Sequence, residues 1–247
     1  IVVGAGHAGC EAAAGAANLG NKVLLVTMDL RLFASMSCNP AMGGIAKGQI
    51  VREIDALGGY SGIVSDRSMI QFRMLNKSKG PAMWSPRCQS DKMLFSAEWR
   101  KLLEQTPKLN FWQDSVVGLL FEGDKVCGVK TFMGGDIHSK AVILTNGTFL
   151  NGLIHIGEQH FPGGRMGEVA SHGITEQLKE IGFEAKRLKT GTPMRIDGRT
   201  IDFSTLIEQK GDEDVVGFSY TEPFRIKEQK SCWMAHTSLK VHETLRK

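Results

Sequence analysis

The stretch "SMSCNPAMGGIAKG", residues 35–48, places one cysteine between an Asn-Pro step and a pair of glycines. A thiolate is a strong nucleophile, and a nearby positive charge or a helix N-terminus favours this ionised form. Lys47 and a helix predicted to begin near Gly48 can supply both to Cys38. Free cysteines, however, usually fill space as small buried hydrophobes. The spacing therefore leaves two interpretations of Cys38 open: a catalytic thiol held in a shaped loop, or a packing residue.

A second candidate site lies at residues 4–9, which carry the Gly-x-Gly-x-x-Gly pattern of a dinucleotide-binding turn. An apolar strand precedes the turn and an alanine-rich helix follows it. In such a turn the first glycine permits the tight bend, the second lets the backbone approach a pyrophosphate, and the third lets the helix pack closely. The helix N-terminus then offers free N–H groups to the phosphates. We predict cofactor contacts from all six residues of the turn: Gly4, Ala5, Gly6, His7, Ala8 and Gly9.

The position that usually holds the adenosine ribose departs from the standard pattern. An acidic residue is expected where the second strand ends. That strand is predicted at residues 22–26, and Thr27 follows it, with Asp29 two positions later. A threonine hydroxyl can hydrogen-bond a ribose, although more weakly than a carboxylate does.

Another glycine pattern fails as a phosphate site. Gly43 and Gly48 have the glycine spacing of a P-loop, but Gln49 and Ile50 stand where a lysine and a serine or threonine are required. We therefore predict that this stretch binds no nucleoside triphosphate.

The sequence after residue 115 distinguishes between two dinucleotides. Short apolar runs split by Gly-Asp and Gly-Gly-Asp turns predict a three-stranded β-meander at 115–138 and a buried strand at 141–145. A plain NAD domain alternates strands and helices, whereas this insert and the "ILTNG" turn resemble the flavoproteins of the glutathione-reductase type. We therefore expect FAD at the glycine turn, with an unrelated β-insert as the alternative.

These elements predict an α/β fold: an FAD-binding, Rossmann-like parallel sheet with a β-meander and the start of an inserted second domain. We place the FAD-binding domain at residues 1–190, including a basic insert at 60–105. Residues 191–247 are expected to begin an NAD-related or substrate domain that is cut short. Three helices are predicted from their apolar spacing and caps: one with Ile50, Val51, Ile54 and Leu57 on its buried face, one at 90–105 capped by Ser90, and one with Ile174, Leu178 and Ile181 on its buried face.

Charge is concentrated in one part of the chain. The 247 residues carry a net charge of +4, but residues 67–101 hold eight basic side chains against Asp91 and Glu98. Phe72 and Trp84 lie between these cations. Three interpretations stay open: a solvated face, an arginine for the flavin phosphates, or a surface that binds nucleic acid through phosphate contacts and base stacking. The basic residues are Arg67, Arg73, Lys77, Lys79, Arg87, Lys92, Arg100 and Lys101.

Composition excludes several other classes of protein. Hydrophobic residues make up 42% and charged residues 23%, the range of a globular protein with a sizeable core. No apolar run approaches the length of a membrane span, and no charged leader precedes an apolar segment, so we expect a cytoplasmic protein without membrane contact. Because the chain opens inside a strand without a methionine, we also expect residues upstream of Ile1. The cysteines form no Cys-x-x-Cys pair, so neither a disulfide framework nor a metal site is predicted; they are Cys10, Cys38, Cys88, Cys127 and Cys232.

Several stretches together resemble one family. "GAGHAGCEAA", "MSCNPAMGGIAKGQIVREIDALGG", "IQFRMLNKSKGPA", "TNGTFLNGLIHIGE" and "LKTGTPMRIDGRTIDF" are similar to the tRNA uridine carboxymethylaminomethyl modification enzymes, the MnmG or GidA family. The resemblance covers nearly the whole chain, and the threonine at the end of the second strand fits it.

The resemblance implies a concrete activity. Such enzymes bind FAD, oxidise NADH to reduce it, take a one-carbon unit from methylenetetrahydrofolate and modify C5 of the wobble uridine of tRNA. They work with a GTPase partner of the MnmE type, as a homodimer within a heterotetramer. Family FAD contacts correspond to residues 4–9, Val116 and Ser171, and the proposed catalytic cysteine to Cys38. A second cysteine motif, a returning FAD segment and a helical C-terminal domain are expected after residue 247.

Two alternatives remain. A folate- and FAD-dependent tRNA uridine methyltransferase shares the flavin fold, but we expect its cysteine loop to lack "SCNPAMGG". A non-catalytic, flavin-dependent RNA-binding module needs the basic segment and has no use for a reactive Cys38.

Overall fold

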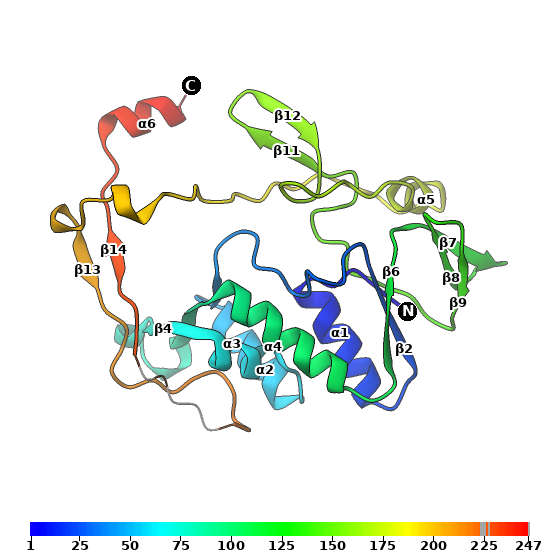
Figure 1. Cartoon of the computed structure of the whole chain (residues 1–247), viewed down its shortest axis with the longest axis horizontal. Helices are drawn as coiled ribbons and strands as arrows, with labels where there is room; N and C mark the ends of the chain where they lie inside the picture. Colours follow the sequence, from blue (N-terminus) through cyan, green and yellow to red (C-terminus); the bar gives the residue numbers. More distant parts are fainter. Residues whose placement is uncertain (223–225, 227, 247) are drawn as a thin grey trace.

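The computed structural model describes residues 1–222, 226 and 228–246. Its centre is a four-stranded parallel sheet with the strand order β10-β1-β2-β6 (Figure 1). Successive side chains of a strand point to opposite faces, so Val2 and Leu25 pack into one layer and Val3 and Val26 into the other. The strands are β1 (Val2–Val3), β2 (Val23–Thr27), β6 (Leu109–Gln113) and β10 (Ile143–Leu144).

Helices cover one face of this sheet. The alanines of helix α1 (His7–Asn18) pack with Phe95, Trp99 and Leu103 of helix α4 (Lys92–Gln105). Trp99 and Phe95 are completely buried. This layer contains more buried apolar residues than the other apolar clusters of the described chain. Small side chains on α1 let the helix approach the strand that precedes it, which fixes the turn between them.

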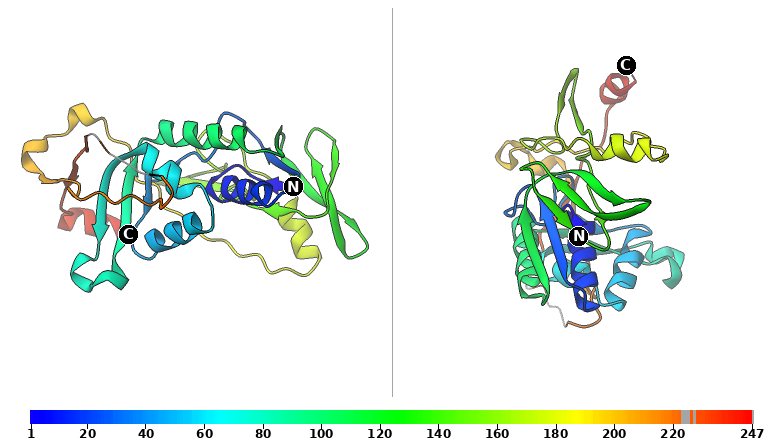
Figure 2. Two further views of the ribbon diagram at one scale, coloured as in Figure 1. Left: turned by 90° about the horizontal axis from the view of Figure 1, so that it is seen from below. Right: turned by 90° about the vertical axis from the view of Figure 1, so that its right-hand side faces the viewer.

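The predicted meander covers the other face. Strands β7 (Val116–Glu122), β8 (Lys125–Thr131) and β9 (Asp136–His138) form an antiparallel sheet in sequence order. Together with helix α5 (Ile174–Glu180) they bury Val116, Val129 and Ile174 against β1 and β2. Figure 2 shows the meander at one end of the molecule. The meander expected from the turn pattern is thus confirmed.

A second antiparallel sheet lies at the opposite end, in the order β3-β5-β4 (Figure 2). Its strands are β3 (Ala41–Gly43), β4 (Met69–Leu75) and β5 (Ser85–Ser90), and two short 3-10 turns, Lys77–Lys79 and Pro81–Met83, join β4 to β5. The sequence pattern predicted no strand in residues 60–89 of the basic insert. Gly80, Pro81 and Pro86 indicate turns, but Pro86 lies inside β5, opposite Met74 of β4.

Helix α2 (Lys47–Ala56) buries a different face from the one predicted. Val51 is buried as expected, but Ile50 is 53% exposed and Leu57 is 89% exposed. Gly48 and Asp55 are buried instead. The helix turns its small and acidic residues inward, because Gly48 meets β5 and Asp55 holds a distant backbone segment, as described below.

Three further boundaries differ from the predictions. Asp91, and not Ser90, caps α4, because its carboxylate accepts hydrogen bonds from the amides of residues 93 and 94 at 2.9 and 3.1 Å. The strand predicted at 141–145 is limited to β10, where Ile143 is 42% exposed at the sheet edge. Ile181 follows the end of α5 and is 50% exposed, so only Ile174 is fully buried there.

The rest of the described chain is more extended. A hairpin of β11 (Leu153–Ile156) and β12 (Gln159–Pro162) stands out beside α5, and β13 (Ile207–Gln209) pairs with β14 (Cys232–Met234) before helix α6 (Leu239–Leu245) (Figure 1). Helix α3 (Ser61–Ser68) connects α2 to β4, and Phe218 packs against Phe72 and Cys88 in a separate small core. Across the described residues, the helices are too short or too polar to cross a membrane.

Candidate functional site

The glycine turn between β1 and α1 is closed by Thr145, which follows β10. The Thr145 amide donates to the carbonyl oxygen of Val3 at 2.9 Å, and its hydroxyl lies 2.7 Å from that oxygen and 3.0 Å from the carbonyl oxygen of Gly4. Gly4 has a φ of +98°, which favours glycine. A Cβ on Gly9 would lie 1.7 Å from the Gly4 carbonyl oxygen. Glycine at these two positions is therefore a requirement of packing.

Gly6, unlike Gly4 and Gly9, has open space where a side chain would lie. An added Cβ there would meet no atom within 4 Å, because Gly6 lines a cavity of about 370 Å³. Gly6 is also the N-cap of α1 and provides no side chain to cap it, so the first N–H groups of the helix stay available. An open glycine at an uncapped helix N-terminus fits a phosphate-bearing ligand.

The cavity gathers residues that are far apart in the sequence. Most of the predicted cofactor contacts line it, and so does Cys38. Ala8 is exposed on the first turn of α1 and Gly9 is buried beneath the turn, so neither lines the cavity. The predicted contacts that do line it are Gly4, Ala5, Gly6, His7, Val116 and Ser171. The full lining comprises residues 3–7, 26–29, 32, 35–39, 114–116, 145–149, 165, 168 and 171.

Ser171 and Val116 form one wall of this cavity. The Ser171 hydroxyl donates to the Val116 carbonyl oxygen at 3.3 Å, and its amide donates to the Phe149 carbonyl oxygen at 2.8 Å. Ser171 is buried. These bonds join the start of the meander to the loop after β10, which explains how two contacts predicted from separate segments reach the same wall.

His7 fixes the start of the cysteine loop. Its Nε2 lies 3.0 Å from the carbonyl oxygen of Ala34, whose amide donates to the carbonyl oxygen of Ala5 at 2.8 Å. The His7 ring also meets Phe95 edge-on, with centroids 5.3 Å apart. Burial lowers the pKa of His7, so the ring is neutral near pH 7 and donates to Ala34 without adding charge. Residue 34 is thereby tied twice to the glycine turn.

Cys38 follows this anchor and is half-buried, with a free thiol. Its Sγ lies 3.3 Å from Oγ1 of Thr192, and its carbonyl oxygen accepts a hydrogen bond from the Arg195 guanidinium. Lys47 is exposed at the start of α2, and within the described residues it makes no hydrogen bond to Cys38. Thr192 is thus the polar partner of the thiol and Arg195 the partner of the Cys38 backbone. Both lie in the stretch "LKTGTPMRIDGRTIDF", whose sequence gives no sign of a contact with residue 38.

The glycine pair after Cys38 serves packing. A Cβ on Gly43 or on Gly48 would lie 2.3 Å from the carbonyl oxygen of Pro86 in β5, and Gly43 also touches the ring of Phe218. The Gly44 amide donates to the same Pro86 oxygen at 2.9 Å. These glycines let β3 and α2 approach β5, so their spacing needs no phosphate to explain it.

The end of β2 supplies a carboxylate after all. Thr27 and Asp29 both line the cavity. The Arg31 side chain and amide hold the Asp29 carboxylate at 2.7 to 3.2 Å, and these hydrogen bonds lower the pKa of Asp29 to about 2. Asp29 is therefore an ionised acceptor at any physiological pH, beside the threonine that occupies the usual acidic position.

The comparison that decides the family covers the whole chain. The model of the glucose-inhibited division protein A family, GidA, matches residues 1–247. The chain belongs to the GidA family.

Curated relatives of the GidA family are similar over the full length of this chain. The chain is 66% identical to a protein of Flavobacterium johnsoniae and 63% identical to one of Cytophaga hutchinsonii, each named tRNA uridine 5-carboxymethylaminomethyl modification enzyme MnmG. All 247 residues align in both cases, but they cover 40% of each relative. The chain thus spans about 40% of the length of the curated relatives it matches.

Solved structures of the GidA family share the fold. The form I crystal structure of Aquifex aeolicus GidA superposes with a TM-score of 0.95 at 46% identity, covering 99% of this chain and 42% of that chain. A GidA-related protein from Thermus thermophilus gives a TM-score of 0.53 at 26% identity, covering 74% of this chain and 68% of that chain. The α/β fold class expected from the sequence is confirmed.

One residue of the site in this GidA-family chain escaped prediction from the sequence. Arg165 lines the cavity, pairs with Glu168 at 2.7 Å and lies over the Phe149 ring at 5.4 Å. Its Nε is buried and has no hydrogen-bond partner among the described residues. A buried donor without an acceptor costs free energy, and this Nε is out of reach of the cavity; the Arg165 side chain as a whole still brings a positive charge to the cavity wall, which suits an anionic ligand. The "GGRMGE" stretch, with arginine and glutamate three apart, was the available signal.

The basic segment lies away from this cavity. None of its eight cations is among the residues that line the described cavity. Three of them form ion pairs: Arg67 with Glu98 and Glu222, Lys77 with Asp212, and Arg100 with Glu104. Arg73 and Arg87 face each other directly across β4 and β5. The structure thus gives no support to the interpretation that this segment contacts the flavin phosphates.

Proposed function

We propose that this chain is the FAD-binding part of a tRNA modification enzyme that attaches an aminomethyl-type group, such as carboxymethylaminomethyl, to C5 of the wobble uridine. The observation that supports this most is the single cavity in which the glycine turn, Val116, Ser171 and Cys38 meet. A dinucleotide site beside a thiol suits a redox enzyme that also attacks a pyrimidine. The names of the relatives point to the same substrate.

The chain's own residues suggest how FAD is held. The backbone amides at the start of α1 take the pyrophosphate, and Gly6 leaves the room for it. Thr27 and the Asp29 carboxylate are placed for the ribose hydroxyls, and Arg165 adds a positive charge to the cavity wall. Val116 and Ser171 line the same cavity. When bound, FAD supplies two-electron redox chemistry, with NADH as reductant and methylenetetrahydrofolate as the one-carbon donor.

Cys38 is proposed as the nucleophile. Its thiolate adds to C6 of the uracil ring, and the displaced electron pair makes C5 nucleophilic, so that C5 would bond to the methylene carbon of the folate while a bond from that carbon to a folate nitrogen breaks and the nitrogen keeps the electron pair. Loss of the C5 proton then expels the thiolate and restores the ring. The half-buried position of Cys38 on the cavity wall gives the thiol one open side toward a substrate base.

The tRNA partner is proposed to contact the β4–β5 hairpin, whose surface we define as Arg73, Lys77, Lys79, Trp84 and Arg87. Two like charges in direct cross-strand register destabilise a sheet, and the Arg73–Arg87 pair is such a case. An anionic partner relieves that repulsion. Trp84 is 42% exposed and can stack on an unpaired base. This combination favours nucleic-acid binding over a merely solvated face.

The wider assembly belongs to the same proposal. We infer a cytoplasmic homodimer that joins a GTPase of the MnmE type in a heterotetramer, and we propose residues 191–247 as the start of an inserted NAD-related or substrate domain. The support is family membership together with the length of the relatives, of which this chain covers 40%.

One experiment tests the function. The intact protein is examined for a flavin absorbance spectrum and for its bleaching by NADH without oxygen. A deletion strain is then complemented with the wild-type gene or with Cys38→Ser, and its tRNA nucleosides are analysed by mass spectrometry. We expect the modified wobble uridine with wild type and its loss with the variant.

Other outcomes select the alternatives. A plain methyl group lost at another tRNA position would identify a folate-dependent methyltransferase. Normal modification by Cys38→Ser would remove the thiol from the mechanism. Tight tRNA binding without any nucleoside lost in the deletion strain would leave a non-catalytic RNA-binding module.

A further inference from the structure

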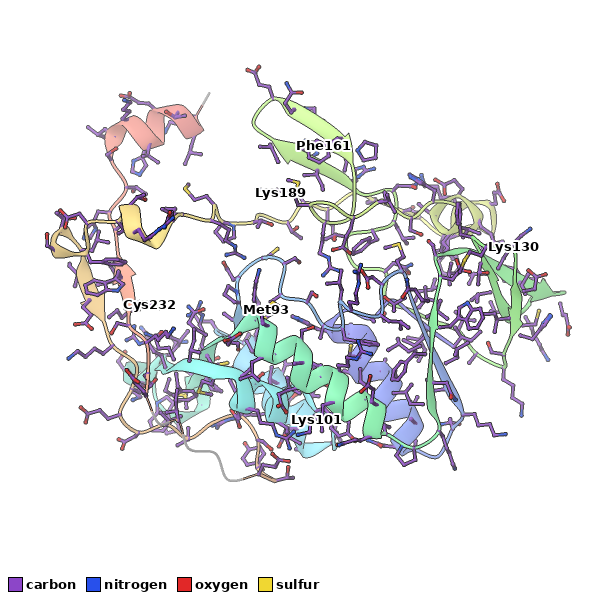
Figure 3. All side chains as sticks on the ribbon, viewed as in Figure 1. Met93, Lys101, Lys130, Phe161, Lys189 and Cys232 are labelled. Atoms are coloured by element: carbon purple, nitrogen blue, oxygen red, sulfur yellow. The ribbon has the colours of Figure 1, made fainter. Side chains whose placement is uncertain are left out.

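Residues 184–196, which we call the strap, run across the molecule without helix or strand (Figure 1). They connect α5 to the first 3-10 turn of the following segment, and nearly all of them are exposed. Figure 3 shows Lys189 on this strap, above the loop that carries Cys38. Ordered segments of this length without secondary structure are uncommon in a compact protein and often serve a function.

The contacts of the strap are concentrated on one residue. In the described part of the chain, Arg187 donates to the Asn151 carbonyl oxygen at 2.7 Å, and the other two hydrogen bonds from the strap both reach Cys38. Thr192 meets the thiol and Arg195 meets the backbone of the same residue. A segment that only connected two elements would not be expected to direct two of its side chains to the same cysteine.

The local sequence prepares both contacts. Thr192 precedes Pro193, which restricts it to extended backbone, and its branched side chain has few rotamers. The hydroxyl is thus held in place at little further entropic cost. Arg195 has no carboxylate within ion-pair distance among the described residues, so its charge beside the cysteine loop is not neutralised.

We propose that Thr192 and Arg195 are positioning residues for the Cys38 thiol. The Thr192 hydroxyl donates a hydrogen bond to the sulfur when the thiol ionises. Arg195 fixes the loop backbone and adds a positive charge near the thiolate. The proposal rests on the proposed role of Cys38 and extends it to the strap. It predicts that the strap increases the reactivity of the thiol, whereas a simple cover would decrease it.

The test measures thiol reactivity and needs neither flavin turnover nor tRNA. Iodoacetamide is added to the intact protein at pH 7; the thiolate sulfur bonds to the reagent's methylene carbon, iodide leaves, and the thiol proton passes to the buffer. Mass spectrometry of peptides gives the rate at Cys38. Thr192→Val should lower that rate about tenfold, the order expected for one hydrogen bond to a charged atom, whereas Thr192→Ser should keep it within about twofold of wild type.

Arg195 is tested by a similar pair of variants. Arg195→Met should lower the Cys38 rate severalfold, and Arg195→Lys, which keeps a charged donor, should restore most of it. Met194→Gln is the matched control, because Met194 lies on the same strap, is 80% exposed and, among the described residues, makes no hydrogen bond to Cys38. Cys10 and Cys88 are buried, and burial raises their pKa values to about 12 and about 11, so their alkylation would reveal a variant that has unfolded.

Two results would overturn the proposal. An unchanged rate in Thr192→Val would make the hydroxyl contact incidental, and a faster rate in Arg195→Met would make the strap a cover. Because the measurement stands apart from tRNA chemistry, failure of the proposed function would appear separately, as normal nucleosides in Cys38→Ser.

Discussion

A methyl group placed on Gly9 would lie 2.6 Å from the hydroxyl oxygen of Thr145. The glycine turn and the residue after β10 are therefore fitted to each other, since the same hydroxyl also bonds the backbone of the turn. Gly6, three residues earlier, faces open space. Two glycines of one motif thus have separate tasks: Gly9 makes the fold compact, and Gly6 makes room for a ligand.

Alanine at each position should separate those tasks. Gly9→Ala forces a Cβ against the Gly4 carbonyl oxygen and should lower the free energy of unfolding by about 3 kcal/mol or more. Gly6→Ala meets no atom and should change stability by less than about 1 kcal/mol, while reducing bound flavin severalfold. Urea unfolding and flavin absorbance measure the two effects. If both variants lost flavin and stability together, the division of tasks would be wrong.

Thr145→Val should loosen the same turn from the other side. The substitution keeps the shape of the side chain but removes the hydroxyl that bonds to Val3 and Gly4, so we expect a loss of about 1–2 kcal/mol. Thr145→Ser keeps the hydroxyl and serves as the control. Chemical unfolding of the three proteins gives the comparison, and equal stability of the valine variant would show that the hydroxyl contributes nothing.

Local patterns in the sequence were sufficient for much of this fold. The glycine turn and the meander follow from neighbouring residues: turn glycines, apolar runs and their periods. The buried face of α2 was predicted correctly at Val51 but not at Asp55, which is also buried and whose carboxylate accepts a hydrogen bond from the amide of Tyr220 at 2.8 Å. A hydropathy pattern places a carboxylate outside unless that distant donor is known.

The candidate site shows the same limit. Cys38 and the turn residues were found from motifs, but Arg165 and Thr192 reach the cavity or the thiol through long-range packing. No spacing in the sequence indicates that residue 192 returns to residue 38. Motifs therefore predicted residues that line the cavity better than they predicted the distant residues that contact them.

Reversing one charge of the Arg73–Arg87 pair should raise the stability of the protein and lower its affinity for tRNA. Arg87→Glu turns a like-charged cross-strand pair into an opposite one, while leaving Arg73 beside Asp212, and should stabilise the protein by about 0.2–1 kcal/mol. It should also weaken tRNA binding and reduce the dependence of the binding constant on salt by about one phosphate contact. Thermal unfolding and filter binding at several salt concentrations provide the readouts.

The matched control for that variant is Lys125→Glu. Lys125 begins β8 and is exposed, at the other end of the molecule from β4 (Figure 1). It makes the same change in net charge, so an equal loss of tRNA affinity would mean that total charge, and not the β4–β5 hairpin, determines binding.

Asp66 predicts how stability changes with pH. Its carboxylate in α3 accepts hydrogen bonds from the amides of Phe218 and Ser219 at 2.8 to 2.9 Å, with Asp55 and Arg52 nearby. Burial is the largest effect and raises the pKa of Asp66 to about 6, while these amides and Arg52 oppose the rise and Asp55 adds to it. The folded state therefore holds this proton more tightly than the unfolded chain, whose aspartates titrate near pH 4.

The sign of the effect follows from that difference. Between about pH 4 and pH 6 the folded protein binds more protons at Asp66 than the unfolded one, so its contribution to stability falls as pH rises, by about 2–3 kcal/mol in total, and is constant above. Asp66→Asn removes this titration. Urea unfolding from pH 4.5 to 7.5 should show wild type losing stability relative to the variant across that window. Parallel curves for the two proteins would mean that Asp66 stays ionised in the folded protein. The hydrogen bonds from the Phe218 and Ser219 amides would then outweigh the effect of burial on the pKa of Asp66.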